Sequence, residues 1–298
     1  MNKTLLITGA GPRGVTGKLI KEYFEAKYNL LTPGSSELDL TDDYAVSHFF
    51  TNHKIDYVIH CATFRPTSVH NGHFVDEELE SNLRMFYALA SQSAKFEKMI
   101  YFGSGAEFDK SNPIIEASET EFGRSIPKNK YGLGKYIMNT YTSNSDNIIN
   151  FRLFGTINKY ERPDKNVISN ICIKAIKGKP LNLKKNCRFS FVDIEDVLPL
   201  LEYALCHNMK HKDYNITNGN PCFLSDIGDI ISSFMNENKA IVFEKEGLNN
   251  EYTGSNIRLQ SEHPIHFTPL HKSIKKVYDY YTSISDDINV DNIDNRWK

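Results

Sequence analysis

A short apolar run near the N-terminus leads directly into a glycine-rich segment. The apolar residues 5–7 precede residues 8–17, Thr-Gly-Ala-Gly-Pro-Arg-Gly-Val-Thr-Gly, and a helical pattern begins at Gly17. Glycines between a strand and a helix permit a tight turn and let the backbone approach a pyrophosphate, which then faces the N–H groups at the helix N-terminus. This order predicts a dinucleotide-binding loop, with cofactor contacts at Gly9, Gly11, Gly14 and Gly17.

Strand-like and helix-like segments alternate through the first half of the chain. We expect strands at 3–8, 29–32, 55–62, 98–102 and 147–152, with helices at 17–28, 42–52, 77–93 and 131–142. Alternation at this spacing is typical of parallel strands joined by crossover helices, and continuously apolar strands fit a sheet that is covered on both faces. The predicted fold is α/β, a Rossmann-like doubly wound parallel sheet that binds its ligands at the carboxyl edge.

The alternation becomes less regular after Phe154. A helix is expected at 166–177, and short strands within 181–191. We therefore predict a dinucleotide-binding domain over 1–155 that is rejoined by about 189–217, and a smaller C-terminal α/β substrate lobe made of 156–188 and 218–285. Residues 286–298 are polar and acidic, and we expect a frayed tail.

Composition excludes several classes of protein. The 298 residues carry 35 Lys+Arg against 37 Asp+Glu, and this near-neutral balance argues against a dedicated nucleic-acid binder. No apolar run approaches the roughly 18–20 residues that span a bilayer. The apolar run at residues 5–7 is too short for the core of a signal peptide. The five cysteines are scattered and never spaced CxxC, and the histidines suggest no metal site. We expect a soluble, reduced, cytoplasmic protein.

The segment after the second strand bears on the choice of dinucleotide. A site that prefers NAD places Asp or Glu there to accept the ribose 2′-OH. Residues 32–36 instead read Thr-Pro-Gly-Ser-Ser. Arg13 could reach a 2′-phosphate, and the hydroxyls of Ser35 and Ser36 could donate to it. The pattern favours NADP(H), with NAD(H) possible, and the alternative for Arg13 is a solvated loop charge.

A tyrosine and a lysine four residues apart indicate the chemistry. Tyr131 and Lys135 share one face of the predicted helix, where the lysine charge favours phenolate and lowers the tyrosine pKa, as proton donation to a carbonyl requires. Ser104 follows the strand at 98–102 and would share the carbonyl oxygen with Tyr131. We predict Ser104, Tyr131 and Lys135 as catalytic, with Tyr131 and Lys135 also contacting the cofactor.

The motifs, in this order, resemble those of extended short-chain dehydrogenase/reductases that act on nucleotide sugars. The resemblance rests on the glycine loop, Asp39-Leu40, His60-Cys61-Ala62, Asn82, Ser104, Tyr131-x-x-x-Lys135, and residues 152–155, 191–197 and 214–219. Segments 11–17 and 36–42 are most similar to GDP-fucose synthase and related 4-keto-sugar reductases. The resemblance implies NADPH, a nucleotide-diphosphate sugar substrate, a homodimer, and cofactor contacts at Asp39, Leu40, Cys61 and Ala62.

Two departures narrow the reaction that the resemblance implies. Nucleotide-sugar dehydratases carry an Asp-Glu pair after the serine, where this chain has Gly105-Ala106. GDP-fucose synthases use a cysteine and a histidine to epimerise carbons beside the ketone, and those positions are Ala106 and a position near Asn166. Both departures favour simple reduction of the ketone.

A basic stretch lies in the predicted substrate lobe. Residues 165–192 contain no Asp or Glu but seven Lys and Arg, which could attract a diphosphate, although most of the lysines are expected on solvated faces. Arg188 is the candidate for a phosphate fork. Other candidate substrate contacts are Arg65, Asn166 and Arg258, and Glu107, which either contacts substrate or faces solvent. His60 is interpreted as a packed, structural histidine.

The predicted function is NADPH-dependent reduction of a nucleotide-linked 4-keto-6-deoxy sugar in surface-polysaccharide precursor biosynthesis. One alternative is a nucleotide-sugar 4-epimerase with tightly held NAD, which the missing carboxylate after the second strand disfavours. Another is a non-catalytic NADP-sensing regulator of the same fold, which the complete set of Ser104, Tyr131 and Lys135 disfavours.

Overall fold

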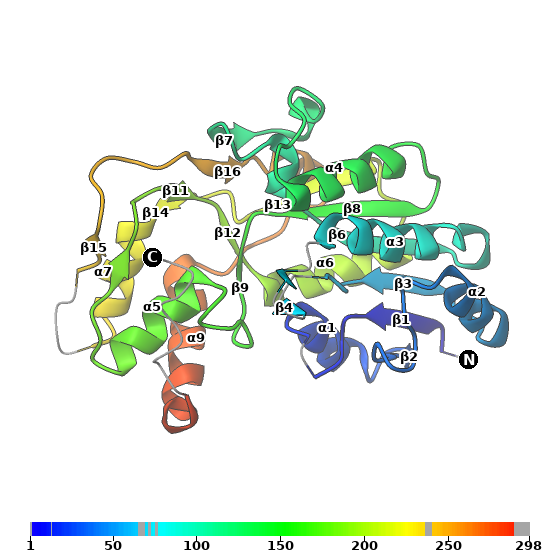
Figure 1. Ribbon diagram of the computed structural model, residues 1–298, viewed down its shortest axis with the longest axis horizontal. Coiled ribbons are helices and arrows are strands. Elements are labelled where there is room, and N and C mark those ends of the chain that lie inside the picture. Colours follow the sequence, from blue (N-terminus) through cyan, green and yellow to red (C-terminus); the bar gives the residue numbers. More distant parts are fainter. Residues whose placement is uncertain are drawn as a thin grey trace. The chain divides into compact units, whose positions relative to one another are not determined.

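The computed structural model describes residues 2–12, 14–64, 69–70, 73–74, 77–235 and 240–288, and divides into two compact units (Figure 1). Unit 1 comprises Met1–Ser111, Ser118–Leu153 and Val197–Asn215. Unit 2 comprises Asn112–Ala117, Phe154–Asp196 and Ile216–Lys298. Within the segment predicted to rejoin the first domain, about 189–217, residues 189–196 belong to unit 2 and the chain returns to unit 1 at Val197.

Unit 1 is built on a six-stranded parallel sheet in the order β13-β8-β6-β3-β1-β2. The strands are β1 (Thr4–Thr8), β2 (Asn29–Leu31), β3 (Tyr57–His60), β6 (Lys98–Ser104), β8 (Ile148–Leu153) and β13 (Asp213–Ile216). The strand order changes direction at β1. Strand β2 lies on one side of β1, and the later strands of this sheet, β3, β6, β8 and β13, lie on the other side. The predicted doubly wound α/β fold is confirmed, and this switch point is where such sheets bind ligands.

Helices cover both faces of this sheet. They are α1 (Thr16–Phe24), α2 (Asp43–Asn52), α3 (Glu78–Ala90), α4 (Lys130–Thr142) and α6 (Ile194–Cys206), with short 3-10 turns η1 (Ser93–Lys95), η2 (Gly105–Phe108) and η3 (Glu119–Glu121). One core cluster joins Leu6 of β1 to Phe50 of α2, Phe86 of α3 and Met138 of α4. Leu5 and Ile7 alternate with Leu6 and are equally buried, so the strand is enclosed on both sides as its sequence predicts.

Local chemistry fixes the start of the helix that carries Tyr131. The side chain of Asn129 accepts a hydrogen bond from the backbone N–H of Gly132 at 2.7 Å, which caps α4. A Cβ added at Gly132 would lie 2.7 Å from the carbonyl oxygen of Ala106, so glycine is required for α4 to approach η2 this closely. The first turn of α4 is therefore held against the turn that follows β6.

Unit 2 is smaller and less regular. Its strands are β7 (Ile114–Ala117), β9 (Gly155–Ile157), β10 (Asn182–Leu183), β11 (Arg188–Phe189), β12 (Phe191–Asp193), β14 (Cys222–Phe223), β15 (Val242–Phe243) and β16 (Tyr252–Gly254). They form a four-stranded sheet, β14-β11-β16-β7, and the pairs β9-β12 and β10-β15. The helices are α5 (Val167–Ile176), α7 (Leu224–Ser232), α8 (Ile257–Glu262) and α9 (Leu270–Ser283), followed by the turn η4 (Ser285–Asp287). The core of the unit joins Ile171, Ile227 and Ile274 of α5, α7 and α9.

Several predicted boundaries differ from the structure. The first helix ends at Phe24 instead of residue 28, and the third at Ala90 instead of residue 93, because Ser91 bonds back to the Ala88 carbonyl and the chain turns into η1. The strands that were not predicted are β7, β9, β13, β14, β15 and β16, together with the short hairpin of β4 (Val69–His70) and β5 (His73–Phe74). Most of the predicted frayed tail, residues 289–298, lies outside the described residues.

Three further expectations concern the chain as a whole. Among the described residues no helix is both long and apolar enough to cross a bilayer. The structure shows no cluster of metal-ligating side chains in the ranges it describes. The cysteines are free thiols at positions 61, 172, 187, 206 and 222.

Candidate functional site

The glycine-rich segment follows β1 and forms a loop that packs against itself. Gly9 has a φ of +71°, and a Cβ there would lie 2.6 Å from the backbone nitrogen of Ala62. A Cβ at Gly14 would lie 2.0 Å from the Gly9 carbonyl oxygen, and one at Gly17 would lie 2.4 Å from the same atom. These three glycines are thus required by the fold of the loop and by its approach to the end of β3.

Gly11 differs from its neighbours in the loop. A Cβ at Gly11 would meet no atom within 4 Å, so the backbone is open on this side. The N-terminus of α1 follows at Thr16, and a helix N-terminus favours an anion. The loop therefore fits a dinucleotide pyrophosphate, with Gly11 as the point of close approach. Arg13, the predicted partner of a 2′-phosphate, lies outside the described residues.

The other predicted cofactor contacts lie near the carboxyl ends of β2 and β3. Ser35 and Ser36 follow β2 and are exposed. Asp39 accepts hydrogen bonds from the hydroxyl and the backbone N–H of Thr41, which lower the pKa of its carboxyl, and Leu40 is buried. The carboxylate of Asp39 therefore stabilises the local turn from Asp39 to Thr41.

The loop after β3 is fastened to β1 through Thr8. The backbone nitrogens of Cys61 and Ala62 donate to the Thr8 hydroxyl oxygen at 3.2 and 3.3 Å. The same oxygen lies 2.8 Å from Nδ1 of the buried His60. Since the hydroxyl already accepts two bonds, its own proton is donated to Nδ1. Burial, with a smaller contribution from the charge of Lys135, lowers the pKa of His60 to about 3, so His60 is a packed, neutral histidine.

Folding stability should depend on pH through His60. Because the pKa of His60 falls from 6.5 to about 3 on folding, the unfolded chain binds a proton between these values and the folded chain does not. The contribution of His60 to the free energy of unfolding is therefore fully present above pH 6.5. It is lost as the pH falls below that value, by up to about 1.4 kcal/mol per pH unit. Urea unfolding of His60→Asn at several acidic pH values should show a pH slope smaller by up to one proton. An unchanged slope contradicts the prediction, and His48→Asn, at an exposed position on α2, is the matched control.

The three predicted catalytic residues lie on neighbouring elements of unit 1. Ser104 ends β6 and caps η2, where its hydroxyl oxygen accepts a hydrogen bond from the Ala106 N–H at 3.2 Å. Lys135 is 6% exposed, and its ammonium group donates to the carbonyl oxygen of Phe102 at 2.7 Å. Tyr131 lies one turn before Lys135 on α4 and is partly exposed. The close approach at Gly132 holds α4, which carries Tyr131 and Lys135, against the turn that follows Ser104.

Glu107 is not where either expectation placed it. The side chain is fully buried, so it neither contacts substrate nor faces solvent, and both alternatives are wrong. The physical reason is the short turn η2, in which the third residue folds back to the N-terminal amide, so that Oε1 accepts the Ser104 N–H at 3.0 Å. The other oxygen, Oε2, accepts Nε of the equally buried Arg152 at 2.8 Å.

Arg152 and its partners form a buried polar network that the sequence analysis missed. Its two terminal nitrogens donate to Asp213 and Asn215, at 2.8 and 2.9 Å. Asn150 lies two residues before Arg152 on the same strand and donates to both oxygens of Glu107. A signal was present, because a charged and an amide side chain stand within an otherwise apolar strand, and buried charges require partners.

Three of the remaining candidates belong to unit 2, and the side chains of Arg188 and Asn166 form hydrogen bonds within it. Arg188 donates to Glu251 and to Glu116, each at 3.1 Å. Asn166 caps α5, since it accepts from the Ile168 N–H and donates to the Thr156 carbonyl. Its amide thus stabilises the start of α5, and its role as a substrate contact stays a prediction. Arg258 lies on α8 and is partly exposed, and Arg65 lies outside the described residues.

The basic stretch of unit 2 is heterogeneous. Lys165 pairs with Asp164 at 3.4 Å, and Lys174 is buried. Lys179 and Lys184 are exposed, and Lys185 is partly exposed. These lysines therefore do not form one uniform exposed surface, and a role in attracting an anion stays a prediction for the exposed ones.

Similar sequences are known for most of the chain. Residues 5–217 match the NAD dependent epimerase/dehydratase family. GDP-L-colitose synthase of Yersinia pseudotuberculosis is 21% identical over 267 residues, which cover 81% of this chain and 85% of that protein.

Two solved structures resemble the chain over nearly its whole length. GDP-mannoheptose C4 reductase of Campylobacter jejuni, with NADP bound, has a TM-score of 0.76 at 18% identity and covers 94% of this chain and 98% of its own. GDP-L-fucose synthetase of Naegleria fowleri, bound to NADP, has a TM-score of 0.77 at 17% identity and covers 95% of each chain. At these identities the likeness is one of fold, and it agrees with the sheet of unit 1.

Proposed function

The chain belongs to the NAD dependent epimerase/dehydratase family, and from this premise we propose that it catalyses the NADPH-dependent reduction of a nucleotide-linked 4-keto-6-deoxy sugar. The observation that carries the proposal is the placement of Lys135. Its buried ammonium group is fixed on the Phe102 carbonyl, two residues before Ser104, on the helix that also presents Tyr131. A reductase needs this combination of a proton donor, a nearby cation and a hydroxyl that orients the carbonyl.

Each residue has a distinct role in the proposed reaction. The hydroxyl of Ser104 holds the oxygen of the sugar ketone, and the hydroxyl of Tyr131 donates the proton that this oxygen takes up. The charge of Lys135 favours the phenolate that Tyr131 becomes, and it keeps α4 aligned on β6 through the bond to Phe102. When bound, the dinucleotide supplies the hydride for the keto carbon.

NADP(H) is the proposed cofactor. The open backbone at Gly11 and the start of α1 would hold the pyrophosphate. The exposed Ser35 and Ser36 follow β2, without a carboxylate before Glu37 to accept a ribose 2′-OH. The NADP that is named with the Campylobacter and Naegleria structures supports the same choice.

Reduction without dehydration or epimerisation is the proposed outcome. Glu107 is the first carboxylate after Ser104 along the chain, and its burial against Arg152 keeps it from acting as an acid or base on the sugar. Ala106 has no side chain to move a proton. The names of the relatives make GDP-linked sugars the first substrates to test, in the synthesis of surface-polysaccharide precursors. We propose a cytoplasmic location, which suits the five free cysteines.

Oxidation of NADPH in the presence of defined keto sugars tests this function. The purified protein is incubated with NADPH or NADH and with GDP-, CDP-, dTDP- and UDP-linked 4-keto-6-deoxy sugars, and the loss of reduced nicotinamide absorbance is followed. We expect turnover with at least one keto sugar and faster turnover with NADPH. Interconversion of ordinary nucleotide hexoses with no net oxidation of NADPH would instead indicate the epimerase. Binding of NADP(H) without any turnover would indicate the regulator.

Two alanine substitutions in the glycine loop should separate folding from cofactor binding. Gly11→Ala adds a methyl group to open space, so the free energy of unfolding should stay within about 0.5 kcal/mol while the Kd for NADPH rises at least about tenfold. Gly14→Ala puts a Cβ 2.0 Å from the Gly9 carbonyl and should cost about 1–3 kcal/mol of stability. Urea unfolding and fluorescence titration measure both, and wild-type NADPH affinity in Gly11→Ala would show that the pyrophosphate lies elsewhere.

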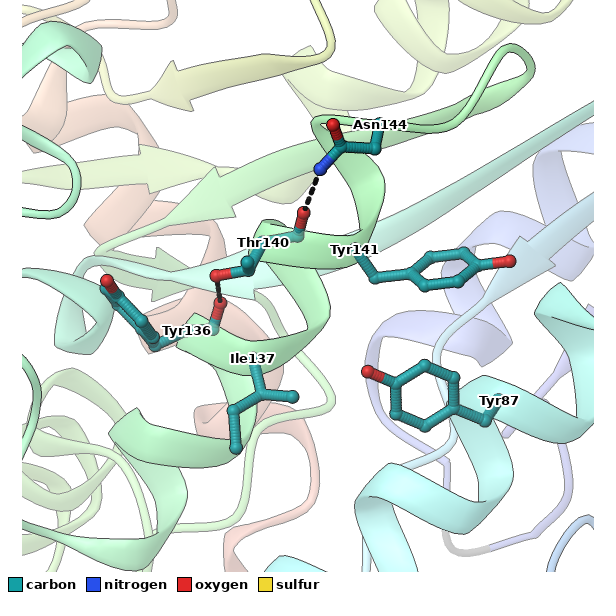
Figure 2. Close-up of a pocket in the computed structure, with 6 residues that line it drawn as sticks. All are labelled: Tyr87, Tyr136, Ile137, Thr140, Tyr141 and Asn144. Atoms are coloured by element: carbon teal, nitrogen blue, oxygen red, sulfur yellow. Dashed lines mark hydrogen bonds between the residues drawn. The ribbon is translucent and has the colours of Figure 1, made fainter.

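A homodimer formed through α3 and α4 is the proposed assembly. A surface pocket of about 480 Å³ lies along α4, with Tyr87 of α3 and Tyr141 of α4 at its edge (Figure 2). The rings of Tyr87 and Tyr141 meet edge to face, 5.3 Å apart, and each residue is 38% exposed. Exposed tyrosines around a pocket are typical of interface anchors.

Light scattering on the purified chain tests the assembly. We expect twice the mass of one chain for wild type and for Tyr44→Glu, which changes an exposed tyrosine on α2. Tyr141→Glu places a charge in the pocket and should give a monomer. A dimer that tolerates Tyr141→Glu would place the interface on another face.

A further inference from the structure

We propose that Glu107 is a positioning residue for Ser104, which it fixes to the sheet through the buried ion pair with Arg152. The inference rests on the proposed function, because it gives Ser104 a role in holding the ketone oxygen. Glu107 itself is fully buried and acts only through the backbone and side chains that it bonds.

Glu107 closes the turn that carries Ser104. Its Oε1 accepts the backbone N–H of Ser104 at 3.0 Å, while the hydroxyl oxygen of Ser104 accepts the N–H of Ala106 at 3.2 Å. Both the backbone and the side chain of Ser104 are thus held within one short turn, η2. The same turn lies against Gly132, the residue that follows Tyr131 on α4. A shift of η2 would therefore change the position of Ser104 relative to Tyr131.

Arg152 connects this turn to the sheet. Its Nε donates to Glu107 at 2.8 Å, and its terminal nitrogens donate to Asp213 and Asn215 of β13. The guanidinium carbon also lies 4.8 Å from the centre of the Phe108 ring and 5.6 Å from that of Phe122. A planar fork with all three of its nitrogens engaged has one orientation available, so Glu107 is held by a rigid partner.

Only a carboxylate satisfies all the donors that point at position 107. Oε1 accepts from Ser104 and Asn150, and Oε2 accepts from Arg152 and Asn150. A glutamine has only one accepting oxygen. In either orientation of its amide, the NH₂ group would face one of the donors that now point at Glu107. Gly103 provides the necessary space, because a Cβ there would lie 2.1 Å from Asn150 and 2.2 Å from Glu107. The neighbouring residues are thus matched to a buried charge.

A double-mutant cycle distinguishes positioning of Ser104 from a general structural role. We compare wild type, Ser104→Ala, Glu107→Gln and the double variant, using the keto sugar and NADPH. We expect Glu107→Gln to lower kcat at least about tenfold and to leave the KM for the sugar within about twofold. In the Ser104→Ala background the same change should lower kcat by less than about threefold, since the group it positions is absent. Glu202→Gln, a change to a partly buried carboxylate on α6, should keep wild-type kcat.

Either of two results overturns the proposal. One is a wild-type kcat for Glu107→Gln. The other is a loss in kcat that is equal in the two backgrounds, since Glu107 would then act independently of Ser104. If Glu107→Gln does not fold, Arg152→Lys takes its place in the cycle, because it retains the positive charge but offers one nitrogen in place of three.

Hydrogen exchange of the ligand-free protein gives a readout that needs no activity. The amide of Ser104 donates to Glu107, so exchange in a peptide covering residues 103–108 should accelerate at least about fivefold in Glu107→Gln. A peptide covering β1 should keep its wild-type exchange. Unchanged protection at 103–108 rejects the positioning role. If the wild-type protein reduces no keto sugar, the proposed function fails, and this exchange experiment still decides whether Glu107 holds Ser104.

Discussion

Tyr131→Phe is expected to lower kcat for reduction of the keto sugar by about 10²–10⁴-fold. The change removes one oxygen and with it the proton that the ketone oxygen takes up, while the ring keeps its place at the start of α4. Steady-state oxidation of NADPH at saturating sugar measures kcat. The loss in kcat should be the full contribution of proton donation, because no other side chain in the proposed mechanism donates a proton to this oxygen.

Cofactor binding is the control for Tyr131→Phe. The glycine loop that would hold the pyrophosphate follows β1, on a different element from Tyr131, so the Kd for NADPH should stay within about threefold of wild type. The unfolding midpoint should also be unchanged, since the residue is partly exposed. A kcat within tenfold of wild type would remove Tyr131 as the proton donor.

Arg152→Met is expected to lower the free energy of unfolding by about 3–5 kcal/mol. The substitution fills a similar volume but leaves the carboxylate of Glu107 fully buried without its cationic partner. Asp213 contributes less to the loss, because its side chain is 16% exposed and water can replace one of its bonds. Urea unfolding at neutral pH measures the change, and the slope of the transition shows whether unfolding stays two-state.

The matched control removes both charges. Glu107→Gln/Arg152→Met should be more stable than Arg152→Met alone, because the fully buried charge of Glu107 is removed together with its partner. If Arg152→Met loses less than about 1 kcal/mol, the carboxylate of Glu107 has another means of compensation, such as protonation. Burial does raise the pKa of Glu107, although the charge of Arg152 and hydrogen bonds from Ser104, Arg152 and Asn150 oppose this.

Local sequence was sufficient to predict five of the six strands of the sheet in unit 1, all except β13. The runs at residues 5–7 and 99–102 are continuously apolar, and this property depends only on burial from both sides. Strand β7 could not be predicted in this way, because it has four residues and pairs with Tyr252–Gly254, more than a hundred residues later in the chain. Residues 112–117 and 189–193 likewise pair with distant parts of the chain, through β7, β11 and β12.

In the candidate site, too, some positions follow from local sequence and others depend on contacts with distant residues. The positions of Ser104, Tyr131 and Lys135 follow from a strand end and one helix turn, which are local features. The burial of Glu107 depends on Arg152, 45 residues away, and nothing in the sequence around Glu107 indicates that partner. Arg188 was predicted on charge alone, and charge does not reveal that Glu116 and Glu251 already engage its guanidinium group.

The way the chain alternates between its two units has a consequence for synthesis in the cell. The chain changes unit five times, after residues 111, 117, 153, 196 and 215. The 61 positions that separate Arg152 from Asp213 take about 3–12 s to synthesise at about 5–20 residues per second. During this interval the guanidinium group that anchors the turn of Ser104 has Glu107 but neither of its partners on β13. The turn that carries Ser104 can therefore become rigid only after β13 has been synthesised, long after the whole glycine loop has been made.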